Sequence, residues 1–121
     1  MTTKEAVTFH KLDRNLLAPT ILEAENGFVK QDFLKNCTVH IAISSDIQLG
    51  DSVGPALHVE GTGGLFSGPI VVTEEHLVNG IDWQPSKNLI ARPGAAVAAY
   101  YSVKKNDGCN SESPPGSYIV K

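Results

Sequence analysis

The sequence predicts an all-β domain, a Greek-key sandwich of about seven strands, and two observations support this. In residues 95–101 the apolar side chains recur at every second position, which is the period of a pleated strand and not of a helix. Eleven glycines and seven prolines are spread over 121 residues, as expected of short strands joined by tight turns. No catalytic or cofactor motif accompanies these patterns, so the sequence indicates a kind of domain more clearly than an activity.

The first half of the chain contains strand patterns separated by a clear turn. A strand at residues 20–24 leads into Asn26-Gly27, a pair that supplies the positive φ angles of a tight turn, and residues 28–29 continue the edge. Residues 37–43 alternate an apolar face with a wetter one, which is typical of a half-buried strand.

The next strand is expected at residues 51–60, where Gly54-Pro55 interrupts the pattern. Proline cannot donate to a ladder, so we expect a bulge or a sheet edge there. The segment at 74–80 is either a loop or one helical turn capped by Thr73. The other expected elements are a turn at 61–64, strands at 69–73, 81–83 and 95–103, a long polar loop at 104–116 and a last strand at 117–120.

The charge pattern indicates neither nucleic acid nor a membrane as a partner. Ten basic and thirteen acidic residues give a net charge of −3 and are scattered along the chain. Residues 1–16 lack the apolar stretch of a secretory signal, and no segment approaches the length of a membrane span. We therefore expect a soluble domain.

The chain divides into an N-terminal arm, residues 1–16, and one domain, residues 17–121. The arm is polar, but residues 7–9 alternate as a strand would. An open sandwich leaves edge strands whose backbone groups natural proteins cover or pair. We expect the arm to add to such an edge, on this domain or on a neighbouring copy, and the second arrangement would give a homodimer.

A family resemblance rests on turn and core signals taken in order. They are Leu17-Ala18-Pro19-Thr20-Ile21, Gly50-Asp51-Ser52-Val53, Pro85-Ser86-Lys87 and the strand pattern at 95–103. In this order the chain resembles the immunoglobulin-like repeat domains of large bacterial surface and adhesin-like proteins. The resemblance implies an immunoglobulin-like sandwich, a spacer or ligand-presenting role without catalytic residues, and a secreted or cell-surface location. The compartment is not given by the residues themselves.

Candidate ligand-binding residues fall in loops and on one strand. Asp46, Asp51 and Asp107 lie in two loops expected at the same end of the sandwich, and their oxygens are the kind that Ca²⁺ takes. The alternative is that they are solvated turn residues that bond their own backbone. An outward Tyr100 would provide a ring on which a sugar stacks. A carbohydrate-binding, lectin-like domain is therefore the alternative to a non-enzymatic module that binds a protein.

Two further patterns concern reactivity. Cys37 and Cys109 are expected at opposite ends of the sandwich, roughly 20 Å apart, whereas a disulfide needs Cα atoms about 4.4–6.8 Å apart. We therefore expect no internal bridge. No Gly-x-Ser-x-Gly elbow occurs, and nothing in the sequence ties a histidine and an acid to one serine, so we predict that the domain is not an enzyme.

Overall fold

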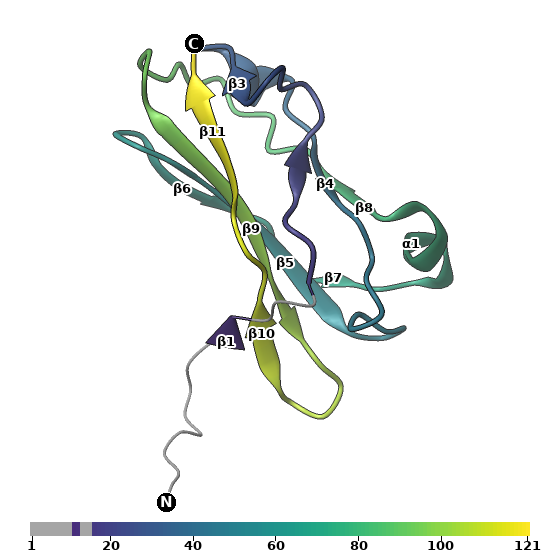
Figure 1. Cartoon of the computed structure of the whole chain (residues 1–121). Helices are drawn as coiled ribbons and strands as arrows, with labels where there is room; N and C mark the ends of the chain where they lie inside the picture. Colours follow the sequence, from purple (N-terminus) through teal and green to yellow (C-terminus); the bar gives the residue numbers. More distant parts are fainter. Residues whose placement is uncertain (1–10, 13–15) are drawn as a thin grey trace, which may run out of the picture.

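The computed structural model describes residues 11–12 and 16–121, and these form two β-sheets that enclose a common core (Figure 1). The predicted all-β class is therefore confirmed. The strands are β1 (Lys11–Leu12), β2 (Thr20–Ile21), β3 (Phe28–Val29), β4 (Val39–Ile41), β5 (Ser52–Val59), β6 (Gly63–Phe66), β7 (Ile70–Val71), β8 (Ile81–Trp83), β9 (Ala96–Lys104), β10 (Asn110–Glu112) and β11 (Gly116–Val120). A 3-10 helix, η2 (Phe33–Lys35), and one α-helix, α1 (Glu74–Asn79), lie between strands.

The large sheet is built around the antiparallel pair β5 and β9. These strands are in register from Ser52 opposite Lys104 to Val59 opposite Val97. Strands β6 and β7 pair with the other side of β5, and β10 and β11 pair with the other side of β9. Strands β1 and β3 pair in parallel with β10 and β11, so two early segments of the chain cover that edge.

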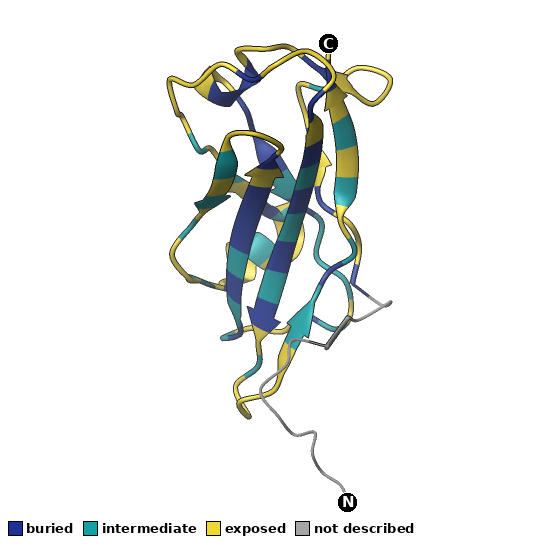
Figure 2. Ribbon diagram, turned by 90° about the vertical axis from the view of Figure 1, so that its left-hand side faces the viewer, coloured by how far each residue is buried: buried dark blue, intermediate teal, exposed yellow. Residues whose placement is uncertain are grey.

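The small sheet consists of β2, β4 and β8, all antiparallel. Val39 and Ile41 of β4 are buried against the large sheet, and Val97 and Ala99 of β9 are buried from the other side. Figure 2 shows the alternation of buried and more exposed residues as bands along the long strands. This is the pattern that the period-two spacing of residues 95–101 predicts.

Two tyrosines of the large sheet form hydrogen bonds with the chain segment that leads into and includes β2 of the small sheet. Tyr101 is fully buried, and its hydroxyl donates to the carbonyl oxygen of Leu17 at 2.6 Å. The hydroxyl oxygen of Tyr118 accepts the N–H of Ile21 at 3.0 Å. Trp83 is half-buried against the same core. Apolar packing and these bonds thus fix the two sheets together.

Strand β5 runs through Gly54 and Pro55 without the predicted bulge, but these two residues do form a local edge, because β7 pairs only with Ser52 and Val53 and β6 only with the residues from Ala56 on. Pro55 is buried and lies opposite Tyr101 of β9, in the middle of the sheet. On the side away from β9, Pro55 faces the segment between β6 and β7, and the N–H of Ser67 in this segment donates to the Pro55 carbonyl at 3.0 Å. The missing N–H of proline therefore faces the place where the neighbouring strand is itself broken, and no ladder bond is lost.

Two strands lie where turns or loops were expected. The expected turn at 61–64 ends earlier, and Gly63 and Gly64 already belong to β6. The expected polar loop at 104–116 contains β10, which forms a hairpin with the end of β9. Glycine and polar residues have little intrinsic strand preference, but pairing with the long strands β5 and β9 holds them extended.

A predicted turn and a predicted helix cap are both confirmed. Asn26 and Gly27 adopt φ angles of 53° and 84°, as the turn requires. Of the two alternatives at 74–80, the helical one is right: Thr73 caps α1 by accepting the N–H of His76 at 3.4 Å, and the His76 ring accepts the N–H of Thr73 at 3.1 Å.

The arm is described only in part. Lys11–Leu12 pairs with β10 of the same chain, which agrees with strand addition to this domain. Residues 7–9, which carry the alternating pattern, lie outside the described residues. Among the residues described, no helix is long and apolar enough to cross a membrane.

Candidate functional site

Two loops meet at one end of the large sheet, below β5 and β9 in Figure 1, and an ion pair joins them. Asp51 is 1% exposed, and its Oδ2 accepts the Lys105 ammonium at 2.6 Å and the N–H of Gln48 at 2.8 Å. Lys105 also donates to the backbone carbonyl of Asp46. The lysine thus bridges the turn after β9 to the loop before β5.

The three predicted aspartates lie at this end, as expected, but their carboxylates have different surroundings. Asp107 is exposed and accepts the N–H of Cys109 at 2.9 Å, a bond that lowers the pKa of the Asp107 carboxyl. Asp46 contributes its backbone oxygen, and Asp51 holds Lys105. The described residues contain no group of three metal-ligating side chains. The Lys105 ammonium occupies one of the two oxygens of the Asp51 carboxylate, Oδ2.

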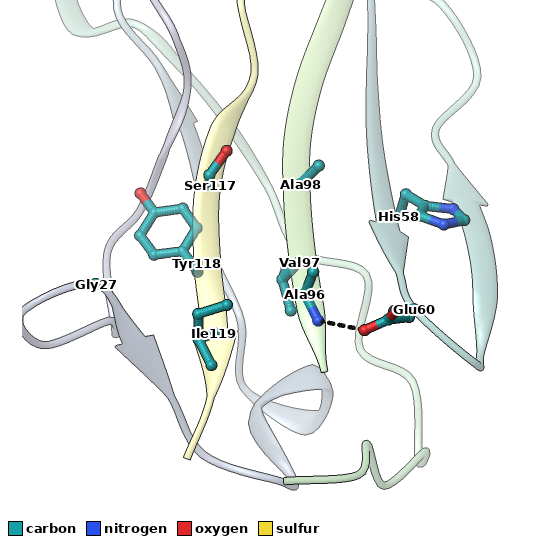
Figure 3. Close-up of a pocket in the computed structure, with 9 residues that line it drawn as sticks. All are labelled: Gly27, His58, Glu60, Ala96, Val97, Ala98, Ser117, Tyr118 and Ile119. Carbon is teal, nitrogen blue, oxygen red and sulfur yellow. Dashed lines mark hydrogen bonds between the residues drawn. The ribbon is translucent and has the colours of Figure 1, made fainter. Parts of the chain in front are cut away.

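The outer face of the large sheet, which points away from the small sheet, carries a hollow of about 390 Å³ (Figure 3). It forms because Ala96 and Ala98 are the outward residues of β9 at this level, while larger side chains project from the strands on both sides. The lining residues are Gly27, His58, Glu60, Ala96, Val97, Ala98, Ser117, Tyr118 and Ile119.

The two walls of the hollow differ in character. Ile119 of β11 lines the hollow and is 41% exposed; its partner in β3, Phe28, lies outside the lining and is 43% exposed. On the opposite wall His58 is exposed, and the carboxylate of Glu60 accepts the N–H of Ala96 at 3.1 Å. The hollow thus offers an apolar wall, a floor of methyl groups and a polar wall.

Ser117 and His58 both line the hollow, but they lie on opposite sides of Ala98. The register places Ser117 opposite Ala98, and Ala98 opposite His58. Their Cα atoms are therefore two strand spacings apart, about 10 Å. A nucleophile and its general base need a direct hydrogen bond of about 3 Å, and this geometry separates them.

Tyr100 lies on the same outer face and is half-buried. It is opposite Ala56 of β5, which in turn is opposite Phe66 of β6. Phe66 is 71% exposed. An aromatic ring on each side of a small residue thus forms a second row on this face, next to the hollow.

The two cysteines occupy different parts of the fold. Cys37 precedes β4 and is buried, whereas Cys109 is exposed in the turn between β9 and β10, at the other end of the molecule (Figure 1). Both are free thiols. Burial, together with the nearby Glu23 carboxylate, raises the pKa of the Cys37 thiol to about 12. The hydrogen bond and charge of Asp107 raise the pKa of Cys109.

Comparison of the chain with protein-family models, with curated proteins and with solved structures finds no match. Fold and site together define a two-sheet, sandwich-like all-β domain with a hollow on its larger sheet. The sequence pointed to Tyr100 and the three aspartates as candidate site residues. It did not point to Lys105 or to the residues that line the hollow. A signal for the hollow exists in the sequence, since alanine occupies outward strand positions where polar residues are usual.

Proposed function

We propose that this chain is a non-enzymatic interaction module of immunoglobulin-like topology, and that the outer face of its large sheet receives a protein partner. The observation that carries the proposal is the hollow over Ala96 and Ala98 with its exposed apolar wall. A concave, partly apolar surface with a polar wall is what a projecting side chain of a partner requires.

The order of strands supports the immunoglobulin-like part of the proposal. Strands β4 and β8 pair in one sheet, and β5, β9 and β11 pair in the other, with the chain crossing between the sheets in sequence order. This pairing is compatible with the B–E and C–F–G pairs of such sandwiches, in which β6 would take the place of the added strand of the variable type. Proteins of this architecture serve many roles, so the role is argued from the hollow and not from the fold.

The non-catalytic part is supported by the separation of Ser117 from His58 and by the use of the Glu60 carboxylate in a backbone bond. These are the polar side chains of the hollow that are capable of proton transfer, apart from the Tyr118 hydroxyl. The oxygen of that hydroxyl accepts the N–H of Ile21. The polar wall is therefore suited to orienting a ligand by hydrogen bonds.

Site-specific photo-crosslinking tests the proposal. A photoreactive residue at Ser117, on the rim of the hollow, should capture a discrete protein from an extract of the source cells, whereas the same residue at Glu75 of α1 should not. Excess unlabelled wild-type chain should abolish the product. The Ala98→Arg variant, which fills the hollow, should fail to compete, and Ala42→Arg, the same change outside the large sheet, should compete normally.

Equal capture from both positions, or competition by a folded Ala98→Arg variant, would refute a partner site in the hollow. Circular dichroism and melting curves of both arginine variants should first establish that the two variants are folded.

A second candidate is a glycan ligand, because Tyr100 and Phe66 flank Ala56 on the same face. Sugars stack on aromatic rings. A glycan array probed with the wild-type chain and with Tyr100→Ala separates the two proposals: loss of a defined glycan signal in the variant would favour the sugar ligand. The ion pair of Lys105 with Asp51 gives no support to a cation-assisted form of this candidate.

A further inference from the structure

The two edges of the large sheet differ in how far they are covered by other strands. On one edge, β1 and β3 pair with β10 and β11. On the opposite edge β6 pairs with β5 and, within the part of the chain that the structure describes, with no other strand. The free N–H and C=O groups of an open edge are a template for another strand, and natural proteins guard them with charges, proline or bulges.

Strand β6 carries none of these guards. No charged residue occurs between Glu60 and Glu74, and Pro69 lies after β6, so that it interrupts the edge only further along. Phe66, the last residue of β6, is 71% exposed. This stretch of edge is therefore uncharged, extended and partly apolar.

The hydrogen-bond phase of β6 shows which of its groups face outward. Ser67 donates to Pro55, and hydrogen-bonded and non-hydrogen-bonded pairs alternate along an antiparallel ladder. Leu65 therefore directs its backbone groups to β5. Gly64 and Phe66 direct theirs to the open edge.

We propose that β6 pairs antiparallel with β6 of a second copy across a two-fold axis, with Gly64 opposite Phe66 and Leu65 opposite its own counterpart. This register uses both outward-directed residues of each copy and makes four backbone hydrogen bonds. It also keeps the side-chain faces of the two sheets in phase, because opposed residues have the same parity. The inference does not depend on the protein partner proposed for the hollow.

Two features of the edge fit a second copy of this chain. In a two-fold interface every charge near the axis meets a like charge, so an uncharged edge is suited to its own copy. Gly64 has no side chain, and a Cβ built on it would already lie 3.0 Å from the ring of Phe66. The ring therefore already covers Gly64 of its own strand, and in the dimer Phe66 of each copy stands opposite Gly64 of the other, where no side chain opposes it.

The interface is small, and the association is weak for that reason. A four-residue edge with one aromatic ring lies well below the size of a standard protein interface. We expect a dissociation constant on the order of 0.1–1 mM. A continuous sheet across two domains, with both hollows on the same side, follows from the antiparallel pairing.

Sedimentation velocity of the full chain from about 10 µM to about 1 mM measures the association. The Cys109→Ser background removes adventitious disulfides. Phe66→Lys should raise the dissociation constant by roughly tenfold or more, because two lysines then meet near the axis. Val78→Lys on α1 is the matched control, since Val78 is 83% exposed and the change is the same in kind. This control should associate like the parent.

The register is tested by Leu65→Cys in the same background. A non-hydrogen-bonded pair has its Cα atoms about 4.5 Å apart, which permits a disulfide, so mild oxidation should give a covalent dimer. Ser67→Cys, which the register places opposite Gly63 and not opposite itself, should give little. A monomer at every concentration, or equal effects of Phe66→Lys and Val78→Lys, would overturn the proposal. So would a dimer that disappears on deletion of residues 1–10 and tolerates Phe66→Lys, because the arm would then make the contact.

Discussion

We expect the ion pair between Lys105 and Asp51 to contribute measurably to the free energy of unfolding. Lys105→Met keeps most of the side-chain volume but removes the ammonium that bonds Asp51 and the Asp46 carbonyl. Asp51 is 1% exposed, and within the described residues its Oδ1 has no hydrogen-bond partner, so the Gln48 N–H is the bond that remains to its carboxylate. The variant therefore leaves a buried charge without its counter-charge.

The size of the loss follows from this geometry. Breaking a buried ion pair from one side costs about 3–5 kcal/mol. The Lys105 side chain is 24% exposed, so water screens the pair and the expected loss is below that range, about 2–3 kcal/mol. For a domain of this length the melting temperature falls by roughly 3–4 °C per kcal/mol, which gives a decrease of about 6–12 °C at pH 7.

Thermal and urea unfolding of the variant, with Lys104→Met as control, measure this loss. Lys104 is the exposed neighbour, and its replacement should change stability by less than about 0.5 kcal/mol. The double variant Asp51→Asn with Lys105→Met should be more stable than the sum of the single losses predicts, because the uncompensated charge is gone. Equal melting of the Lys105 and Lys104 variants, or strict additivity, would refute the reasoning.

Three other predictions concern the core, the thiols and the arm. Trp83→Ala should cost about 2–3 kcal/mol in urea unfolding, because the indole is half-buried against the core; a variant that melts like the parent would place it at the surface. Iodoacetamide at pH 8 should modify Cys109 and spare Cys37 until the domain unfolds, and melting should not respond to reductant, whereas a drop of several degrees would reveal a bridge. Deleting residues 1–14 removes a two-residue pairing with β10 and should lower the melting temperature by less than about 5 °C; a change in solution mass would assign the arm a role in assembly.

The sequence predicted those elements whose pattern is local. The alternation in β9, the Asn26-Gly27 turn and the Thr73 cap depend on neighbouring residues, and all are present. Strands β6 and β10 were not predicted, because their glycines and polar residues become extended only by pairing with β5 and β9. Strand conformation at such positions is set by the partner strand and not by the residue itself.

The candidate site was predicted less well, for a related reason. The three aspartates were correctly placed at one end, but their chemistry depends on Lys105, which comes near Asp51 only through the register of β5 and β9. The hollow likewise arises from three strands in register, each contributing outward residues that have no pattern in common. Long-range pairing therefore decides the surroundings of residues whose type is known from the sequence.

The outward alanines of β9 point to a cost that the isolated domain bears. Alanine is depleted in strands, and β-branched residues at such positions favour strand structure by up to about 1 kcal/mol. Ala98→Thr should therefore stabilise the free domain, by roughly 0.5 kcal/mol, because Ala98 lies on a half-exposed strand face with space above it. The same added groups partly fill the hollow, so this variant should compete poorly in the crosslinking assay.

Ser102→Thr is the matched control for this last prediction. Ser102 is an outward, half-buried residue of the same strand and lies outside the hollow, so its replacement should give a similar gain in melting temperature without loss of competition. If Ala98→Thr lowers the melting temperature, the alanine is needed for packing of the fold itself. If it stabilises and still competes, the hollow does not make the contact. A gain in stability coupled to a loss of binding is the result expected of a surface whose small residues serve a partner.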